Sequence, residues 1–535
     1  MPKSGWKDRL PTGKEGVFKV VAAGAGLSFI GAFLDRGLGY LTRIVIARSM
    51  TPSEYGLLFL AFSLLSVATT FAVFQMNAAT KRYAAYYRGK KDYSSVKGAI
   101  TSALKISVPI SLASFAILFI LSDFISAQIF TEPAMGPVLR IMSFILLFAP
   151  AIEICISATQ AFQSAMYDVL ARKIGKTVIT LAALVVVLWA GLGVGGAAAA
   201  YVIGYAFTAA LSVYFLTRVF PIFSIDVKGT SMKRKLFSFA WPVLLYGIIW
   251  NFNGELGTLI LGALREGTLD VGIFQSALPS ARFLMMIPSA LTALFVPITA
   301  TMFAQGKKEQ ISKVSRTTFR WMFFLNLPLF MVMLLYPNVV MNTLFGAEYM
   351  AAGPVLSVLS IGFFLYPMSA VSVGMLQVYE KTRLHLLNSV VCIAVNASLA
   401  YVLIPFYGSM GNAALGAAIA TTAMFIVYIT LYMIEGYRIS GVSPISKSLA
   451  RSVIAGSGAG AFILAIDVAV PVISLPVLIP AFIGFILVYT TLLMALGGLE
   501  REDIELLKRI EKKTGLKMGP IRRVVKRLAR QVPVL

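Results

Sequence analysis

The sequence has few of the residues that build metal sites, disulfides and most catalytic centres. Among 535 residues it has one histidine and two cysteines, and 13% of the residues are charged. Cys155 and Cys392 both lie inside apolar runs without motif spacing, which argues against a disulfide framework or a thiolate metal site. We interpret the single histidine, His385, as a hydrogen-bonded interface residue rather than a proton relay. We therefore expect neither a metal nor a cofactor.

Long polar connections are also missing from the sequence. A membrane ligase or polymerase needs an acid, base or metal constellation, typically on a sizeable loop outside the membrane. The connections expected to face the outside are short, and Asp123 and Glu132 are not joined there by a histidine. The sequence also has no glycine-rich phosphate loop followed by a lysine and a hydroxyl residue. We therefore expect that the protein is not an enzyme.

Apolar residues dominate the composition. Hydrophobic residues make up 58% of the chain and its mean hydropathy is +0.83, far above the values of soluble proteins. The N-terminal stretch MPKSGWKDRLPTGKEG is polar and basic for too long to be a secretory signal. The composition therefore predicts an all-α polytopic membrane protein, and we expect its first apolar helix to be retained.

Windows of about 20 apolar residues predict about fourteen transmembrane helices. These helices lie near residues 18–47, 55–79, 98–121, 137–162, 174–192, 195–217, 237–263, 271–303, 318–344, 354–378, 386–405, 412–434, 449–469 and 474–496. Lysine and arginine cluster in alternate connections, which predicts a multi-pass protein of the cell membrane with both termini cytoplasmic.

The net charge of +24 has two possible explanations, nucleic acid or the membrane itself. Basic loops set membrane topology and attract anionic lipid. Nucleic-acid binding would need a basic patch interleaved with stacking aromatic residues in a polar domain, and the sequence has none. We therefore expect membrane lipid, and not nucleic acid, as the partner of these charges.

An internal repeat organises the helices. A shift of 217 residues superposes polar and Gly-Pro positions across several helices. The matched pairs include Arg48 with Arg265, Thr51 with Thr268, Gly136-Pro137 with Gly353-Pro354 and, with one residue dropped, Gly56 with Gly272. The repeat predicts a cytoplasmic N-terminus at 1–15, an N-lobe at 16–232, a C-lobe at 233–440, an appended helix pair at 441–499 and a basic cytoplasmic tail at 500–535.

Each repeat copy holds an even number of predicted helices, six, so both copies begin on the same side of the membrane. Parallel repeats of this kind predict a substrate site between the lobes and alternating access by rocking of one lobe against the other. In the tail, Ile521, Val524, Val525 and Leu528 share one helix face opposite the cations. This pattern is typical of a helix on an anionic leaflet, although a solvated basic tail fits it as well.

The first predicted helix carries charges that an ordinary apolar core does not. Arg36 and Arg43 are seven residues apart and lie on one helical face, with Asp35 beside them. Intramembrane charges cost about 2.5–3.5 kcal/mol each and normally face a bundle interior or a wet cavity. We interpret both arginines as cavity residues for an anionic, lipid-borne substrate, since guanidinium groups bind phosphate well. The alternative is an internal ion pair with Asp35 or another carboxylate.

The other arginine candidates have different interpretations. Arg48 points away from Arg43, and both Arg48 and its repeat partner Arg265 either contact substrate or extend to the membrane interface. Arg282 lies well inside the eighth predicted helix, so we interpret it as lining the cavity.

Glu255, with Asn251 one turn before it, and Glu153 are candidates for binding a coupling cation or proton. Under the 217-residue offset Glu255 corresponds to Leu38, opposite the face of the cations. Symmetric lobes would therefore place Glu255 away from them. Five uncharged polar residues could bind sugar hydroxyls or join helices to each other. These are Gln75, Asn77, Gln160, Gln163 and Gln275.

Two segments resemble a known family. Residues 37–65, GLGYLTRIVIARSMTPSEYGLLFLAFSLL, contain the pattern ARxxTxxEYG, and residues 271–300, VGIFQSALPSARFLMMIPSALTALFVPITA, are their second-half counterpart. Both are similar to the polysaccharide-transport branch of the multidrug/oligosaccharidyl-lipid/polysaccharide exporter superfamily. The resemblance covers roughly residues 16–440.

The resemblance implies a flippase that moves an isoprenoid-linked oligosaccharide or related glycan precursor from the cytoplasmic to the outer leaflet. It implies a lipid-linked glycan as substrate, membrane lipids around the protein, with anionic lipid at the basic tail, and glycan-assembly enzymes as partners. Arg36 and Arg48 fall on positions that are cationic in peptidoglycan-precursor flippases, whereas Thr42 and Arg43 replace the Arg-Asp pair usual there.

An exporter of drugs or small cations from the same superfamily is the alternative function. Such an exporter would want acidic and aromatic residues in its cavity. The charges of the first helix are mainly cationic, which favours the flippase.

Overall fold

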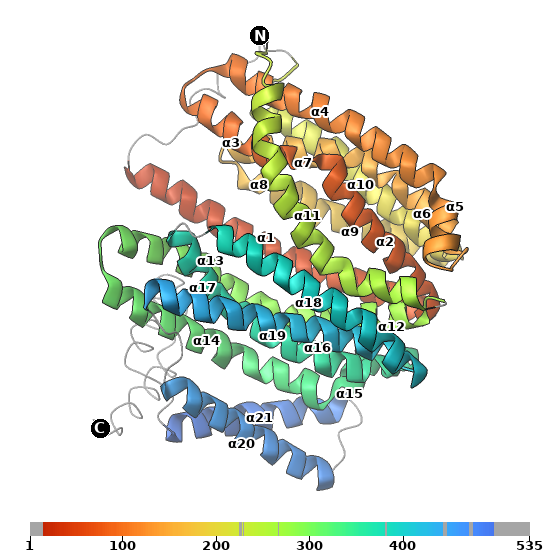
Figure 1. Cartoon of the computed structure of the whole chain (residues 1–535), viewed down its shortest axis with the longest axis vertical. Helices are drawn as coiled ribbons and strands as arrows, with labels where there is room; N and C mark the ends of the chain where they lie inside the picture. The colour runs from red at the N-terminus through yellow and green to blue at the C-terminus, as the bar shows by residue number, and fades with distance from the viewer. Residues whose placement is uncertain are drawn as a thin grey trace. The chain divides into compact units, whose positions relative to one another are not determined.

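A computed structural model describes residues 14–223, 227, 229–265, 267–379, 382–441, 447–469 and 475–496. Every regular element in these ranges is a helix (Figure 1), which confirms the all-α prediction. The longer helices are α1 (Lys14–Ser49), α2 (Pro52–Val73), α3 (Met76–Gly89), α4 (Tyr93–Ile120), α6 (Met135–Ser143), α7 (Ile145–Ala161), α9 (Lys176–Trp189), α10 (Gly193–Val219), α11 (Lys233–Leu264), α12 (Leu269–Arg282), α13 (Met286–Ala304), α14 (Lys308–Leu335), α15 (Pro337–Leu344), α16 (Gly353–Leu365), α17 (Ala370–Val378), α18 (Thr382–Ser409), α19 (Ala413–Ser440), α20 (Lys447–Ala469) and α21 (Leu475–Ala495).

Short turns join some of these helices. They are the α-helical turns α5 (Ser122–Phe124) and α8 (Ala165–Asp168), the π-helical turns η1 (Ile125–Ile129) and η2 (Val169–Gly175), and the 3₁₀ turns η3 (Phe283–Met285), η4 (Ala347–Ala352) and η5 (Tyr366–Ser369). The N-terminal residues 1–13 and the predicted basic tail lie outside the described residues.

Eleven helical segments of the described chain are long and apolar enough to cross a membrane. The other three of the fourteen predicted segments are helical as well, in α1, in η2 with α9, and in α20. The protein is therefore a polytopic α-helical membrane protein, as its composition predicted.

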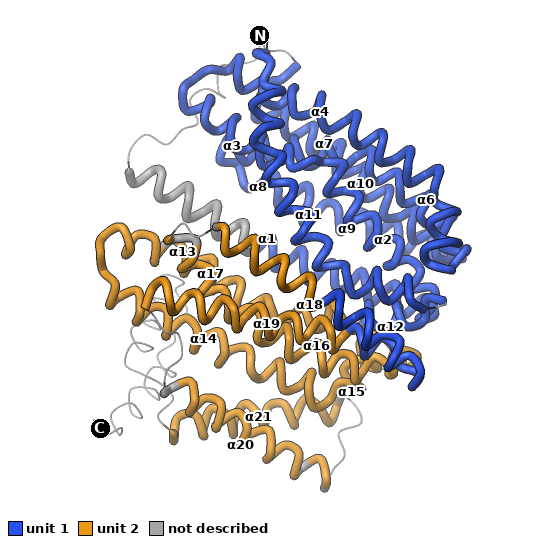
Figure 2. Tube along the Cα trace, viewed as in Figure 1, with its two compact units in different colours: residues 1–276, 396–417 blue, residues 277–395, 418–535 orange. Residues whose placement is uncertain are grey.

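The described residues group into two compact units (Figure 2). Unit 1 takes in residues 1–276 and 396–417, and unit 2 takes in residues 277–395 and 418–535. The chain leaves unit 1 within α12 and returns to it within α18. The lobe boundary between residues 232 and 233, read from the repeat, stays a prediction.

The start of α2 shows what the ARxxTxxEYG motif does structurally. The Thr51 hydroxyl accepts from the Glu54 N–H at 3.4 Å, and the Glu54 carboxylate accepts from the Thr51 N–H at 2.9 Å. This capping box, with Pro52 as the first helical residue, satisfies N–H groups that no helical carbonyl can reach. Tyr55, the next residue of the motif, is fully buried. The conformation of this stretch is therefore specified by its own residues.

Gly56 and Gly272, which the repeat predicted to correspond, face each other in unit 1. A methyl group on Gly56 would lie 2.0 Å from the carbonyl oxygen of Thr268, and one on Gly272 would lie 1.8 Å from that of Pro52. The Thr268 hydroxyl also donates to the carbonyl of Ser53 at 2.7 Å. The N-terminal turns of α2 and α12 therefore meet backbone to backbone, which only glycine permits.

Small residues also join other helices of unit 1. A methyl group on Gly204 of α10 would lie 1.9 Å from the hydroxyl oxygen of Thr180 on α9. In a membrane, where apolar burial does not drive helices together, such close approach supplies the packing energy.

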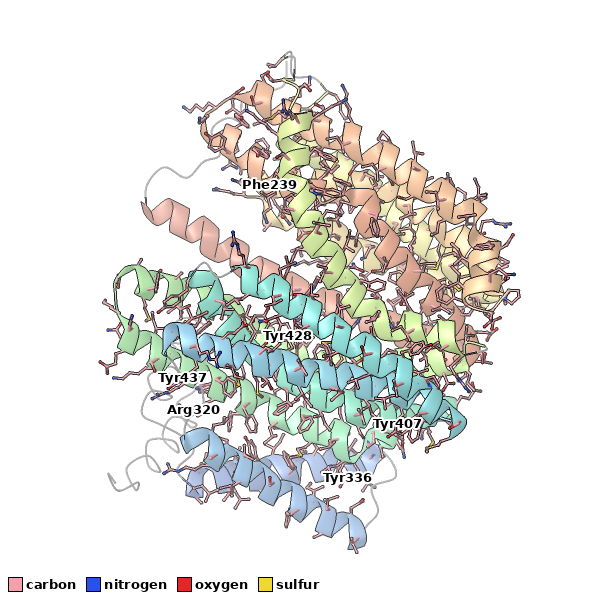
Figure 3. All side chains as sticks on the ribbon, viewed as in Figure 1. Phe239, Arg320, Tyr336, Tyr407, Tyr428 and Tyr437 are labelled. Atoms are coloured by element: carbon pink, nitrogen blue, oxygen red, sulfur yellow. The ribbon has the colours of Figure 1, made fainter. Side chains whose placement is uncertain are left out.

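Unit 2 contains its own buried cluster around α18 and α19. Tyr428 (Figure 3) and Tyr432 pack there with Cys392. His385 accepts from or donates to the Tyr432 hydroxyl through Nδ1 at 2.5 Å, and Asn388 donates to Glu435 at 2.7 Å. The histidine is thus hydrogen-bonded through Nδ1, whereas its Nε2 is buried without a partner among the described residues, so its interpretation as an interface residue stays a prediction.

Helices α20 and α21 pack against each other and against α14 within unit 2. A methyl group on Gly456 of α20 would lie 2.3 Å from a side-chain carbon of Leu327 on α14. These two helices lie in the segment predicted to follow the repeat, and their status as a separate appended pair stays a prediction.

Candidate functional site

A chain of hydrogen bonds crosses four helices of unit 1. Arg43 on α1 donates from Nη1 to the side-chain oxygen of Gln275 on α12 at 3.2 Å and to its backbone carbonyl at 3.4 Å. The Gln275 amide donates to Ser63 on α2 at 3.2 Å. Ser63 donates in turn to Glu255 on α11 at 2.8 Å. A predicted substrate-binding cation and a predicted coupling carboxylate are therefore linked.

Gln275 is the centre of this chain. Its side chain is 2% exposed, and its amide also donates to Thr258 on α11 at 2.8 Å. A buried amide costs free energy unless its donors and acceptor are satisfied, and three residues from three helices satisfy it. The sequence did not predict the roles of Ser63 and Thr258, because Ser63 lies 212 residues from Gln275 and neither residue belongs to a local pattern.

Arg43 is half-buried and has an aromatic contact besides Gln275. Its guanidinium carbon lies 4.0 Å from the ring centre of Phe59 on α2, a cation–π arrangement. The two hydrogen bonds to Gln275 both start from Nη1, whereas a guanidinium group has five N–H donors. Arg43 is thus held in one orientation by Gln275 and Phe59.

A second polar group surrounds Glu153 on α7. Arg172 in η2 forms an ion pair with Glu153 at 3.2 Å and with Asp168 at 2.8 Å. Asn77 on α3 donates to Glu153 at 3.3 Å. The negative charges of Glu153 and Asp168 are thereby shared by one guanidinium, which sequence spacing did not reveal.

Glu153 and Asn251 line one cavity of about 280 Å³ inside unit 1. Asn251 accepts from Ser66 at 3.4 Å. The remaining lining mixes hydroxyl, amide and apolar groups, namely Phe62, Leu65, Ser66, Thr69, Thr70, Val73, Gln75, Asn77 and Tyr205. The structure thus brings two of the three predicted coupling-ion residues into one polar cavity, and Glu255 lies one helical turn after Asn251.

The cavity exists beside a break between α2 and α3 that sequence did not predict. The predicted helix runs through residues 55–79, but Phe74 and Gln75 have φ angles of 53° and 52°. Left-handed residues other than glycine cost about 1–2 kcal/mol each. Tertiary contacts hold them, since the Gln75 amide lies where a side chain on Gly247 would stand, and Phe74 stacks on Phe237 of α11.

The structure places the other predicted cations differently. Arg36 and Arg48 are exposed on α1. Asp35 is half-buried, and the positive charges of Lys176, Lys173, Arg172 and Arg36 attract its carboxylate.

Arg282 belongs to unit 2, at the end of α12. Arg265 forms an ion pair with Asp270 at 3.6 Å. Arg43 is the predicted cation that Gln275 and Ser63 join to a coupling-ion candidate, Glu255.

Within the described part of the chain, no three histidine, cysteine, aspartate or glutamate side chains come together as metal ligands. Cys155 and Cys392 are both buried and unbridged.

We expect Gln275→Leu to destabilise unit 1. The substitution keeps the volume but removes the partner of Arg43, Ser63 and Thr258, and an unsatisfied buried polar group costs about 1–3 kcal/mol. The melting temperature of the purified protein in detergent should fall by several degrees. Gln310→Leu, an exposed residue at the start of α14, is the matched control and should leave the melting temperature nearly unchanged. Equal melting of both variants would contradict the structural role of Gln275.

The fold and these polar groups define a multi-pass α-helical membrane protein with linked cations and carboxylates inside one helical unit. The family described as "Polysaccharide biosynthesis protein" matches residues 21–303, more than half of the chain, and the family described as "MatE" matches residues 242–402. The chain belongs to the polysaccharide biosynthesis protein family, in the multidrug/oligosaccharidyl-lipid/polysaccharide exporter superfamily. The sequence motifs predicted this membership correctly.

Individual proteins are also similar to this chain. An uncharacterised membrane protein of Methanocaldococcus jannaschii is 20% identical over 411 residues, 73% of this chain and 80% of the relative. A "probable low-salt glycan biosynthesis flippase" of Haloferax volcanii is 23% identical over 409 residues, 76% of this chain and 81% of the relative. The solved structure of the lipid II flippase MurJ in an inward closed conformation matches with a TM-score of 0.69 at 13% identity, covering 87% of this chain and 97% of the other.

Proposed function

We propose that the protein is a flippase that carries an isoprenoid-(pyro)phosphate-linked oligosaccharide or polysaccharide precursor from the cytoplasmic to the outer leaflet of the cell membrane. The observation that carries this proposal is Arg43, a half-buried cation held by Gln275 and Phe59 inside a membrane protein of the polysaccharide biosynthesis family. A relative described as a glycan biosynthesis flippase supports the same class of substrate.

Arg43 suits a phosphate in both charge and shape. The guanidinium fork can donate two parallel hydrogen bonds to one phosphate. Its orientation is already set by Phe59 and Gln275, so binding costs less side-chain entropy than it would for a loose arginine. Arg36, two helical turns before Arg43, supplies a second cation on the same face of α1. Arg48, Arg282 and Asp35 remain further candidates for binding the substrate.

Coupling is assigned to the carboxylates of unit 1. Glu255 accepts a hydrogen bond from Ser63. Ser63 in turn accepts from the side-chain amide of Gln275, and the oxygen of the same amide accepts from Arg43. A change in the charge at Glu255 would therefore be felt at Arg43 through two intermediate side chains. Glu153 and Asn251 line the neighbouring cavity of about 280 Å³. We assign to these three residues the binding of a cation or proton whose gradient, or the membrane potential, drives transport.

The proposed cycle is alternating access of the two predicted repeat lobes, with both termini in the cytoplasm. The phosphate binds at Arg43 and Arg36 while the isoprenoid chain stays in lipid. Release on the outer side follows when the lobes rock and the coupling site changes its occupancy.

Export of small organic cations is the second candidate, because the "MatE" family matches residues 242–402 and Glu153 and Glu255 lie inside unit 1. The two candidates differ in the charge of the substrate. Arg43 and Arg36 repel a cation, and an anionic phosphate is attracted by them.

Reconstitution distinguishes the two candidates. Proteoliposomes that hold the purified protein should move a fluorescent isoprenyl-pyrophosphate-linked oligosaccharide between leaflets, measured as protection from a membrane-impermeant glycosidase. Protein-free liposomes are the control. Ethidium efflux from the same proteoliposomes should stay at the level of this control. Ethidium efflux without movement of the glycolipid would replace the flippase by the cation exporter.

A further inference from the structure

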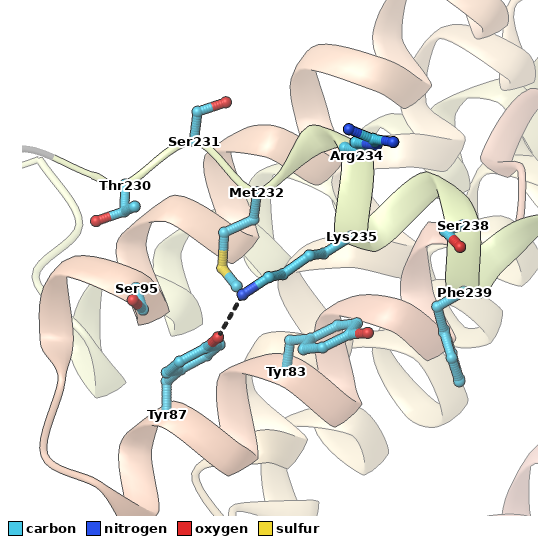
Figure 4. Close-up of a pocket in the computed structure, with 10 residues that line it drawn as sticks. All are labelled: Tyr83, Tyr87, Ser95, Thr230, Ser231, Met232, Arg234, Lys235, Ser238 and Phe239. Atoms are coloured by element: carbon cyan, nitrogen blue, oxygen red, sulfur yellow. Dashed lines mark hydrogen bonds between the residues drawn. The ribbon is translucent and has the colours of Figure 1, made fainter.

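A second, larger cavity lies in unit 1 at the beginning of α11. It has a volume of about 630 Å³, is open to one side, and is bordered by α3, the start of α4, the segment before α11 and the first turns of α11 (Figure 4). Its polar lining includes Tyr83, Tyr87, Ser95, Thr230, Arg234 and Lys235. None of these residues takes part in the Arg43 or Glu153 groups. The cavity is thus a separate place where a polar ligand can bind.

Cations dominate the surroundings of this cavity. The segments 81–97 and 230–238 contain nine lysine and arginine residues and one carboxylate, Asp92. Asp92 caps α4 by accepting from the Ser95 N–H at 3.0 Å. Hydrogen bonds from Ser95 hold the pKa of Asp92 below its ordinary value, so its charge is tied to the helix end. The cavity is therefore strongly electropositive and suits an anion.

The basic run Lys233-Arg234-Lys235 has no explanation in the stability of α11. It occupies the first turn of that helix, where the helix dipole disfavours cations. All three side chains are exposed. In Figure 4, Lys235 reaches across the cavity to the hydroxyl of Tyr87 at 3.4 Å, and Arg234 extends from the other side of the helix start. The two cations thus flank the cavity.

The walls of the cavity are held in place by the surrounding structure. A methyl group on Gly98 of α4 would lie 2.0 Å from the carbonyl oxygen of Thr230, so this segment lies directly on α4. The hydroxyls of Thr230 and Ser94 are 3.0 Å apart, and Met232 donates its N–H to Ser102 at 3.0 Å. A preformed site of this kind loses little entropy when a ligand binds.

Aromatic rings form the opposite wall. The guanidinium of Arg82 lies 4.6 Å from the ring centre of Phe239 and 5.8 Å from that of Tyr83. These cation–π contacts hold both rings beside the cavity. The ring faces offer apolar surface, and the hydroxyls of Tyr83 and Tyr87 offer hydrogen bonds. A sugar has both kinds of surface and can therefore bind against this wall.

An apolar groove adjoins the cavity and shares Arg234 and Ser238 with it. The groove has a volume of about 550 Å³ and is lined also by Ile106, Phe237 and Trp241. Phe237 and Trp241 are 46% and 50% exposed, and Phe74 stacks on both. A tryptophan beside cations at a helix end is typical of the boundary between headgroups and hydrocarbon. The groove can hold the chain of a lipid whose headgroup occupies the cavity.

We propose that this cavity is a loading site, at the predicted cytoplasmic side, that captures the glycosyl (pyro)phosphate headgroup of the lipid-linked substrate before translocation. Arg234 and Lys235 bind the phosphate, the tyrosines and Phe239 contact the first sugar, and the isoprenoid chain lies along Phe237 and Trp241. The inference rests on the proposed flippase function. A volume of about 630 Å³ lies in the range of sites for sizeable ligands and exceeds what one phosphate needs, which favours a glycosylated headgroup over a simple phospholipid.

Binding to the full-length protein in phosphatidylcholine nanodiscs tests the loading site. The probe is a short-chain isoprenyl pyrophosphoryl N-acetylglucosamine, and phosphatidylglycerol is the competitor. Arg234→Gln/Lys235→Gln should weaken probe binding at least about tenfold, because charge-assisted bonds to the phosphate are lost. Lys307→Gln/Lys308→Gln removes the same charge from exposed positions that lie in neither lining and outside both basic segments, and it should weaken probe binding less than about twofold. Tyr87→Phe, a milder change, should weaken binding measurably while the protein melts normally.

The outcomes separate this inference from the function on which it rests. If the wild type moves the glycolipid between leaflets but both double variants bind the probe equally, the loading site is wrong and the flippase stands. If the wild type neither binds nor moves the glycolipid, the function and the loading site both fail. Displacement of the probe by an equal amount of phosphatidylglycerol would overturn the glycosylated occupant, because the cavity would then recognise any lipid phosphate.

Discussion

Arg36→Ala/Arg43→Ala should lower the rate of glycolipid flipping at least about 100-fold. A hydrogen bond between an arginine and a phosphate contributes about 1.5–3 kcal/mol, and each 1.4 kcal/mol lost from the transition state slows a rate about tenfold. Both arginines lie on one face of α1, and Arg43 is already oriented by Gln275 and Phe59. The measurement is the movement of a labelled lipid-linked oligosaccharide in proteoliposomes, at equal amounts of inserted protein.

Two further variants make this result specific. Lys81→Ala/Arg218→Ala removes two cations that are exposed in unit 1, and it should keep nearly the full rate. Arg43→Lys retains the charge but loses the planar fork and its stacking on Phe59, so an intermediate rate is expected. A double alanine variant that flips at the wild-type rate would remove these arginines from the site.

Gly56→Ala and Gly272→Ala should each prevent the accumulation of folded protein. A single methyl group at either position would overlap a backbone carbonyl, at 2.0 Å from Thr268 and 1.8 Å from Pro52. A backbone cannot move aside as a flexible side chain can, and the capping box of Thr51 and Glu54 anchors the adjoining turn. We expect a loss above about 4 kcal/mol, in the range reserved for severe core defects. Size-exclusion chromatography of detergent extracts and thermal melting measure the effect.

Gly484→Ala is the matched control for the two glycine variants. Gly484 lies within α21, and a methyl group there would meet no atom within 4 Å. Because alanine favours a helix over glycine by about 1 kcal/mol, this variant should fold at least as well as the wild type. Normal yield and melting of Gly272→Ala would show that α2 and α12 do not need to meet backbone to backbone.

The sequence was most informative where a property depends on neighbouring residues. Apolar run lengths predicted the helices, and eleven of the fourteen predicted segments also qualify as membrane spans in the described structure. The Thr51 and Glu54 spacing specifies a capping box that the structure contains. The repeat pairs Gly56 with Gly272, and the two glycines meet in the structure. Each of these depends on spacing, size or hydropathy, which can be read along the chain.

The partners of the charged residues could not be read in this way. The 217-residue offset pairs Glu255 with Leu38 and so predicts that Glu255 lies away from the cations. In the structure, Ser63 and Gln275 connect Glu255 to Arg43. The break at Phe74 and Gln75 likewise falls inside one predicted helix, residues 55–79. Stacking of Phe74 on Phe237 and the space beside Gly247 stabilise that break, and both contacts come from α11, far along the chain.

Hydropathy, charge distribution and the repeat thus establish a multi-pass membrane protein of a polysaccharide-transport family with cations in its first helix. They do so because partition into lipid and helix period are properties of short stretches of chain. Only the packed structure decides that Arg43 meets Gln275, that Glu153 meets Arg172, and that a basic cavity forms at the start of α11. Those contacts arise when helices distant in sequence are brought within a few ångströms, and no local pattern encodes which side chains then face one another.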